Sequence, residues 1–155
     1  MVNETNIPNK PCLSGMTEQS WWQRKSYIAL LLCNGNVARS QIGAAYLRSY
    51  APTWQVYSAG IDPNYQMHPL IMQVMAEAGF DLSYERSKHW SEYKDIVPDF
   101  VIALSAEAQD VRTWRGASYI YMPVLDPGWH MTLEQAYTLR AVVSKAICCW
   151  LEGAE

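Results

Sequence analysis

The sequence predicts an α/β fold, a three-layer α/β/α sandwich around a four-stranded parallel sheet. Three observations lead to this fold class. Apolar segments of strand length alternate with segments of helical spacing. The first apolar segment is hydrophobic throughout, as is typical of a strand buried on both faces. A chain of 155 residues with 50% hydrophobic and 17% charged residues is long and apolar enough for one such domain.

Each element of this fold is predicted from its own segment. Strands are expected at Tyr27–Leu32, Trp54–Ser58, Phe100–Leu104 and Tyr119–Met122. Helices are expected at Ser40–Tyr50, Pro69–Ala78, Ala106–Trp114 and Leu133–Leu151. Pro52 and Gly79 are typical of residues that follow a helix end. Strands that alternate with helices favour a parallel sheet covered by helices on both faces.

The chain before residue 27 differs in composition from the rest. It is polar, contains two prolines and a glycine, and shows no steady hydrophobic period. We therefore expect residues 1–26 to form a flexible N-terminal extension, anchored to the body by Trp21 and Trp22. Residues 27–155 are expected to form the domain.

Net charge and cysteine content limit which binding partners and which cellular compartment are expected. The net charge of -3 and the pI of about 5.6 argue against a nucleic-acid partner. No apolar run approaches the roughly 18 residues of a membrane span, and the start of the chain lacks a secretory pattern. The cysteines show no metal-binding spacing; they are Cys12, Cys33, Cys148 and Cys149. We expect reduced thiols, a cytoplasmic protein, and neither metal, organic cofactor nor membrane partner.

One stretch has the pattern of a reactive site, Leu31–Gln41, with the sequence LLCNGNVARSQ. It follows a buried strand and opens a helix, which is where open α/β sheets bind their ligands. Successive backbone N–H groups and the helix N-terminus form a concave anion site there. Gly35 and Asn36 can adopt the positive φ that such a tight loop needs.

Cys33 lies at the base of this loop, where the same field favours its thiolate. Arg39 can fold over the loop and grip two oxygens of a tetrahedral dianion, and Ser40 can donate a hydrogen bond to the sulfur. The spacing Cys-x5-Arg is weak evidence alone, but the following serine and the strand–loop–helix setting make it specific. The alternative is a buried cysteine at a strand end beside an ordinary helix-capping arginine.

At these residues the sequence resembles the low-molecular-weight protein-tyrosine-phosphatase family, which includes the phosphatase-like arsenate reductases. The resemblance covers roughly residues 27–151. After Cys33–Ser40 it continues in family order through Tyr57–Ile61, Ala76–Leu82, Asp99–Leu104 and Leu125–Pro127. Several matches in this order support both the fold and the loop.

The resemblance implies hydrolysis through a cysteinyl-phosphate intermediate. Cys33 would attack phosphorus, Arg39 would hold the equatorial oxygens, and Asp126 would protonate the leaving oxygen and then activate water. Without the resemblance, an Asp before Pro127 is more typical of an ordinary turn. The positions that correspond to the family's phosphate-binding loop are Asn34, Gly35, Asn36, Val37, Ala38, Arg39 and Ser40. Those that brace the loop are Asn36, Ser40 and Ser58.

The predicted reaction is therefore phosphate monoester hydrolysis of the phosphotyrosine type, on a phosphorylated protein or a small oxyanion. Arsenate reduction is the alternative, because arsenate and phosphate are both tetrahedral oxyanions. Ser105, Arg112 and Ala38 stand where relatives carry the additional cysteines of a disulfide relay. A reductase would then need an external thiol besides Cys33. A third hypothesis is a non-catalytic oxyanion-binding regulatory module.

Two further positions differ from the family's potassium-binding reductases, which carry carboxylates near Ala44 and Lys88. We expect no such cation site. One hypothesis is that the Lys88 ammonium replaces the cation, and the alternative is a solvated surface lysine.

Several residues remain candidates for packing or for the site. Cys148 and Cys149 are expected to be small buried residues of the last helix rather than resolving thiols. Trp129 and Tyr65 either line a substrate cleft or pack elsewhere. The histidines are expected to have structural or exposed roles; they are His68, His89 and His130.

Overall fold

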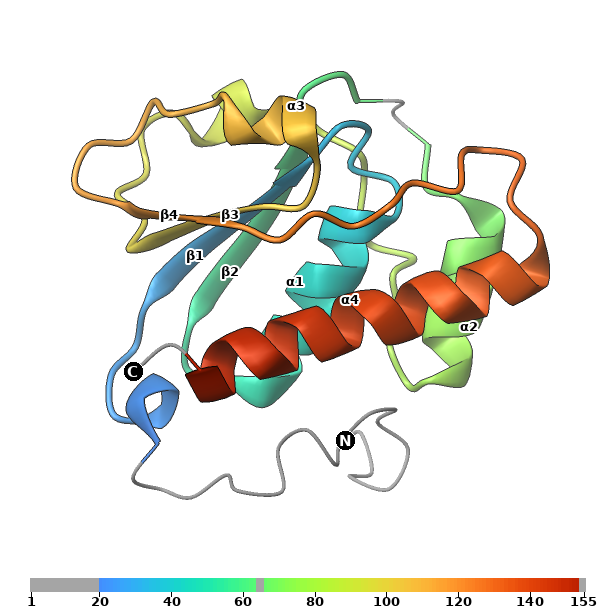
Figure 1. The fold of residues 1–155 in the computed structure, drawn as a ribbon, viewed down its shortest axis with the longest axis horizontal. Helices are drawn as coiled ribbons and strands as arrows, with labels where there is room; N and C mark the ends of the chain where they lie inside the picture. Colours follow the sequence, from blue (N-terminus) through green and yellow to red (C-terminus); the bar gives the residue numbers. More distant parts are fainter. Residues whose placement is uncertain (1–19, 64–65, 154–155) are drawn as a thin grey trace.

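A computed structural model describes residues 20–63 and 66–153, and within them the predicted three-layer fold is confirmed (Figure 1). The strands are β1 (Ile28–Cys33), β2 (Gln55–Gly60), β3 (Phe100–Ala103) and β4 (Ser118–Tyr121). They pair in the order β2-β1-β3-β4, and every pair is parallel. The predicted strands are thus present, with small shifts at their ends.

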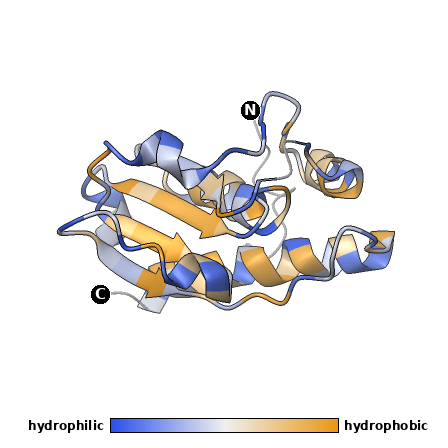
Figure 2. Cartoon of the chain, turned by 90° about the horizontal axis from the view of Figure 1, so that it is seen from above, coloured by the Kyte–Doolittle hydropathy of each residue, from blue (hydrophilic) through white to orange (hydrophobic). Residues whose placement is uncertain are grey.

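β1 lies inside the sheet and is buried on both faces. Leu31 and Cys33 belong to the larger hydrophobic core, whereas Leu30 and Leu32 point into a smaller core on the opposite face. This explains why the strand is apolar at every position instead of alternating. Figure 2 accordingly shows hydrophobic strands in the middle of the sheet, where β1 and β3 lie, and a mixture of hydrophobic and hydrophilic residues along the helices. The strand ends at Cys33, which the sheet therefore holds rigidly.

Helices cover both faces of the sheet. The helices of the larger core are α1 (Arg39–Tyr50), α2 (Pro69–Glu77) and α4 (Leu133–Gly153). The smaller core is covered by α3 (Ala106–Gln109) and by the 3-10 helix η4 (Trp90–Tyr93). Figure 1 shows α3 on the side of the sheet away from α1 and α4. The loops at the carboxyl ends of the strands remain free to build a site between these layers.

The prediction of a helix over Ala106–Trp114 is wrong in its extent, since α3 contains only 4 residues. The β-branched side chains of Val111 and Thr113 weaken a continued helix. Trp114 is instead drawn into the smaller core, and the Tyr119 hydroxyl donates to its backbone oxygen at 2.6 Å. Tertiary contacts therefore override the helical spacing in this segment.

The expected anchoring of the N-terminal segment by two tryptophans is observed. Trp21 and Trp22 are the first two residues of a short 3-10 helix, η3 (Trp21–Gln23). The Trp21 indole donates to Leu151 O at 2.6 Å, and the Trp54 indole donates to Trp22 O at 2.8 Å. Residues 1–19, for which flexibility was predicted, lie outside the described residues, as does Tyr65. Over 20–63 and 66–153, no helix combines the length and hydrophobicity that a membrane crossing requires.

Candidate active site

The loop between β1 and α1 wraps around the sulfur of Cys33. The Cys33 side chain is only 2% exposed, and the backbone N–H of Asn36 points at its Sγ over 3.3 Å. Asn36 has a φ of 53°, so the loop turns back at this residue. The same conformation was predicted for Gly35, but within the loop only Asn36 adopts it. An asparagine tolerates this left-handed conformation better than most residues with side chains.

A chain of hydrogen bonds connects the loop to the sulfur from behind. The Asn36 amide nitrogen donates to Ser40 Oγ at 2.7 Å and to Ser58 Oγ at 3.1 Å. Ser40 Oγ lies 2.9 Å from Cys33 Sγ. Because Ser40 accepts from the amide, its own hydrogen is available to the sulfur. The structure therefore brings Cys33 together with the residues predicted to brace the loop.

The other end of the Asn36 amide is surrounded by donors. Its Oδ1 accepts from the Lys88 backbone N–H at 3.0 Å, from Gln41 Nε2 at 3.2 Å and from Lys88 Nζ at 3.4 Å. Lys88 is only 6% exposed, so the alternative of a solvated surface lysine is wrong. Burial lowers the pKa of Lys88, and nearby Glu85 opposes this shift.

The segment after β2 supports the loop from the side. The backbone N–H groups of Ile61 and Asp62 both donate to Asn34 O at 2.9 Å. This contact needs a glycine at position 60, because a Cβ there would lie 2.7 Å from Asn34 O. The close approach of two backbones explains why the Ser-Ala-Gly sequence at the end of this strand matters for the site.

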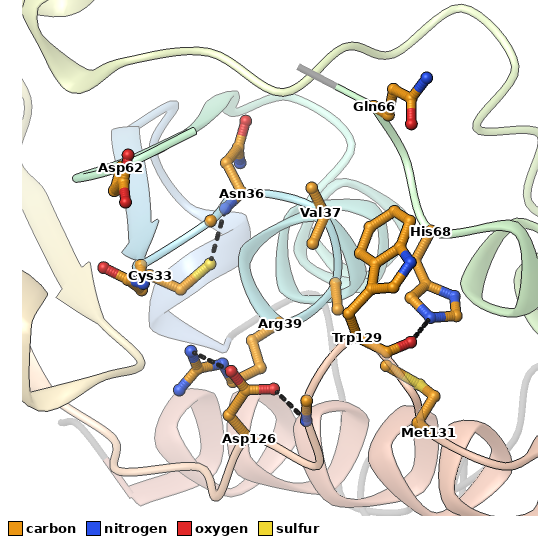
Figure 3. Close-up of a pocket in the computed structure, with 14 residues that line it drawn as sticks. Cys33, Asn36, Val37, Arg39, Asp62, Gln66, His68, Asp126, Trp129 and Met131 are labelled. Carbon is orange, nitrogen blue, oxygen red and sulfur yellow. Dashed lines mark hydrogen bonds and ion pairs between the residues drawn. The ribbon is translucent and has the colours of Figure 1, made fainter. Parts of the chain in front are cut away.

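The predicted general acid and the loop arginine lie next to each other at the mouth of the site (Figure 3). Arg39 Nη2 is 3.5 Å from Asp126 Oδ2, and Nη1 donates to Val124 O at 3.0 Å. Asp126 Oδ1 accepts from the backbone N–H of Gly128 at 2.8 Å. Sequence reasoning placed the guanidinium over the loop, whereas here it is turned toward the Asp126 segment. The Arg39 side chain is 8% exposed and the Asp126 side chain 53%, so the acid faces solvent.

These groups surround one cavity of about 480 Å³. Its floor is the Cys33 loop, and its wall includes Arg39, Asp126 and Trp129. Trp129 is 41% exposed, so a flat ring is presented at the rim. Residues 34–39 line the cavity with Cys33, as predicted, while Ser40 and Ser58 are buried behind it.

His68 also lines the cavity, although sequence reasoning did not assign it to the site. Its Nδ1 accepts from Leu70 N at 3.1 Å and caps α2, so Nε2 carries the proton and donates to Trp129 O at 2.6 Å. The two rings are 4.5 Å apart. No local pattern reveals this contact, because it joins residues 61 positions apart in the chain.

The last helix separates its two neighbouring cysteines. Cys148 is buried in the larger core, whereas Cys149 is exposed, so the expectation of two buried side chains is wrong for Cys149. Successive helical residues point about 100° apart, and the buried stripe of this helix includes Ile147 and Cys148 but not Cys149. In the part of the chain that the structure describes, no group of three His, Cys, Asp or Glu side chains is arranged to hold a metal ion.

The parallel sheet and the loop that surrounds the Cys33 sulfur at the end of β1 are features that place the chain in a known class of proteins. A family model described as low molecular weight phosphotyrosine protein phosphatase matches residues 29–118, more than half of the chain. The chain belongs to this family. The resemblance predicted from the Cys33–Ser40 loop is thereby confirmed.

Relatives in this family carry both activities that the sequence left open. An arsenate reductase of Bacillus licheniformis is 34% identical over 87 residues, which cover 51% of this chain and 57% of that protein. A probable low molecular weight protein-tyrosine-phosphatase, EpsP of Ralstonia nicotianae, is 31% identical over 87 residues, covering 54% of this chain and 60% of that protein. The matched part of the chain thus spans little more than half the length of these relatives.

A solved structure supports the fold independently of close sequence similarity. The tyrosine phosphatase Wzb from Escherichia coli K30, in complex with sulphate, superposes with a TM-score of 0.72 at 20% identity. The superposition covers 84% of this chain and 100% of that one. At this identity the likeness concerns the fold alone.

Proposed function

We propose that this protein hydrolyses phosphate monoesters of the phosphotyrosine type through a cysteinyl-phosphate intermediate on Cys33. The observation that carries this proposal is the convergence of Cys33, Arg39 and Asp126 on one cavity. A nucleophile, a guanidinium and a carboxyl group at one mouth supply the three functions that phosphoryl transfer to a thiol needs.

In the first half-reaction, the Cys33 thiolate forms a bond to phosphorus as the bond between phosphorus and the ester oxygen breaks. Protonated Asp126 gives its proton to the departing oxygen, which leaves as an alcohol or phenol. The backbone N–H groups of the loop and the Arg39 guanidinium hold the equatorial oxygens. Since Arg39 contacts Asp126, an incoming dianion competes with that carboxylate for the guanidinium.

In the second half-reaction, Asp126 acts as the base. Its carboxylate takes a proton from water as the water oxygen attacks phosphorus, and the bond between sulfur and phosphorus breaks. Inorganic phosphate leaves, and the thiolate and the protonated carboxyl group are regenerated. The 53% exposure of the Asp126 side chain leaves room for that water.

The rim of the cavity favours an aromatic ester. Trp129 presents a partly exposed ring beside Asp126, and His68 packs on that ring from the protein side. A phenyl phosphate group can stack against Trp129 while its phosphate lies in the loop. A phosphorylated tyrosine on a protein has this shape and charge.

Arsenate reduction is the second candidate, favoured by the similarity to a protein named arsenate reductase. In this reaction the Cys33 thiolate would bond to arsenic with loss of water. An external small thiolate would then attack the Cys33 sulfur, so that a mixed disulfide forms and arsenite leaves with the electron pair of the broken S–As bond. A further thiol would exchange with this disulfide and set the Cys33 thiol free. Among the described residues, Cys148 is buried in the core, Cys149 lies on the exposed side of the last helix, and neither lines the cavity of Cys33. Ala38 leaves the loop without a second cysteine, so this candidate function uses external reducing thiols.

One set of assays tests these functions. Hydrolysis of p-nitrophenyl phosphate and reduction of arsenate with several thiol donors are measured for the wild type, Cys33→Ser and Asp126→Ala. Cys149→Ser, on the exposed side of α4, serves as the matched cysteine control. We expect hydrolysis to fall by about a thousandfold or more in Cys33→Ser and to persist in the control.

The outcomes separate the candidates. Hydrolysis lost in both site variants supports the phosphatase, and thiol-dependent arsenite production that needs Cys33 but not Asp126 supports the reductase. Phosphate binding without either activity would leave the oxyanion-binding module. Full hydrolysis in Cys33→Ser would contradict a cysteinyl intermediate.

A further inference from the structure

Lys88 is buried directly behind the anion loop. It is 6% exposed, whereas the other lysines in the described residues lie on the surface. Its backbone joins the same region, because Gly60 N donates to Lys88 O at 2.8 Å. A buried lysine is uncommon and costs solvation energy, so its position calls for a compensating role.

Three oxygens converge on the Lys88 ammonium. Nζ donates to Arg86 O at 3.1 Å, to Asn36 Oδ1 at 3.4 Å and to Ser58 Oγ at 3.5 Å. An ammonium has three N–H groups and no lone pair, so this set of acceptors matches its charged form. Two of the three oxygens belong to side chains that also hold the anion loop.

The carboxylates near Lys88 are already paired with other cations. Glu85 forms an ion pair with Arg48 at 3.4 Å, and Glu92 forms one with Arg86. Within the described part of the chain, neither carboxylate makes an ion pair with Lys88. Its positive charge therefore faces the loop without a neutralising partner in contact.

We propose that Lys88 is a positioning residue whose buried ammonium fixes the Asn36 amide and adds a positive charge beneath the oxyanion loop. This inference rests on the proposed function, because it concerns the same site. The residue that favours the thiolate of Cys33 would then lie behind the loop, on the side away from the cavity, and 52 positions from Asn36 in the chain.

The orientation of the Asn36 amide decides what reaches the sulfur. With Oδ1 toward Lys88, the amide nitrogen donates to Ser40, whose hydrogen then points to Cys33 Sγ. With the amide reversed, its nitrogen would face the N–H donors of Lys88, and Ser40 would donate to Oδ1 instead of to sulfur. The cation selects the first arrangement, in which the hydrogen bonds through Ser40 are directed toward the Cys33 sulfur.

The test uses the alkylation rate of Cys33 by iodoacetamide, measured from acidic to neutral pH with the full chain. Lys88→Met removes the charge and keeps most of the side-chain length, and Lys94→Met on the surface is the matched control. We expect the pH at half-maximal rate to move upward in Lys88→Met, with a roughly three- to tenfold slower reaction at mildly acidic pH. Protection of Cys33 by inorganic phosphate should weaken in the same variant.

A second variant separates the charge from packing. Lys88→Ala leaves a space the size of an alkylammonium, so added methylammonium should restore much of the alkylation rate, while tetramethylammonium at equal ionic strength should not. Lys88→Arg, which keeps the charge, should retain more of the rate than Lys88→Met. Unchanged pH dependence in Lys88→Met, or equal effects of the two ammonium ions in Lys88→Ala, would overturn the proposal.

These readouts do not depend on turnover. If the wild type failed to hydrolyse phosphate esters yet Lys88→Met shifted the alkylation profile, the positioning role would stand and the proposed function would fail. If hydrolysis required Cys33 and Lys88→Met changed neither alkylation nor phosphate protection, the reverse would hold.

Discussion

His68 Nε2 donates a hydrogen bond to Trp129 O across 2.6 Å and thereby fastens the Asp126 segment to the first turn of α2. The same imidazole accepts from Leu70 N, so both of its nitrogens are engaged in the neutral form. The position of the aromatic rim thus depends on a histidine that lies outside the chemistry itself.

Replacing this histidine should affect substrate binding more than the loop. In His68→Phe the ring is kept, but the bonds to Trp129 and to the helix cap are lost, so we expect KM for p-nitrophenyl phosphate to rise by roughly three- to tenfold. Inhibition by inorganic phosphate should change little, because the site proposed for phosphate is the Cys33 loop. Steady-state kinetics check both, with the exposed His130→Phe as control. An unchanged KM would show that the rim is held by other contacts.

Removing the carboxyl group of Asp126 should make the rate depend on the leaving group. A poor leaving group such as phenolate needs the proton, whereas 2,4-dinitrophenolate does not. In Asp126→Asn we expect hydrolysis of phenyl phosphate to fall by about 10²–10⁴-fold and that of 2,4-dinitrophenyl phosphate much less. Asp62→Asn removes another carboxylate of the same cavity and is the control. Any loss of hydrolysis that it causes should be equal for the two substrates. Equal losses in Asp126→Asn would argue against an acid role.

Adding one methyl group at Gly60 should displace the Cys33 loop, because Gly60 packs against the backbone of that loop. The new Cβ would lie 2.7 Å from Asn34 O, and backbone atoms cannot move aside easily. We expect Gly60→Ala to lower the free energy of unfolding by about 1–3 kcal/mol and to weaken phosphate protection of Cys33. Urea denaturation and alkylation kinetics measure the two effects. Gly153→Ala, where an added Cβ meets nothing within 4 Å, is the control.

Burial of Lys88 should make stability depend on pH. Burial lowers the pKa of Lys88 below its ordinary value of 10.5, so between the two values the unfolded chain binds more protons than the folded chain. The free energy of unfolding contributed by this group therefore rises with pH in that window. Subtracting the unfolding free energy of Lys88→Met from that of the wild type cancels the other titrations. A difference that stays flat up to pH 10.5 would contradict the burial of a charged ammonium.

The sequence predicted the sheet and the floor of the site because their signals are local. β1, the loop and the start of α1 are consecutive, and the burial of Leu31 and Cys33 follows from an unbroken apolar run. The contacts of His68 and Lys88 depend on segments that meet only after folding. Neither residue stands in a periodic pattern or a motif that names its partner.

The direction of Arg39 shows a second limit of sequence reasoning. Its spacing from Cys33 indicates that the guanidinium can bind the anion. Spacing shows how far the side chain can extend, but not the direction in which it points. The guanidinium bonds to Val124 O and faces Asp126, since these acceptors replace the water that it would otherwise keep. The side chain is buried enough to need such partners.

The indole of Trp21 connects the first described residues to the last turn of the final helix, through Leu151 O. Trp54, Phe100 and Trp150 pack around it at the edge of the sheet where the strands begin. A recombinant fragment starting at residue 27 would lose this latch and expose the aromatic rings. The unit to be expressed should therefore include Trp21, six positions before the domain start at residue 27 that composition suggested.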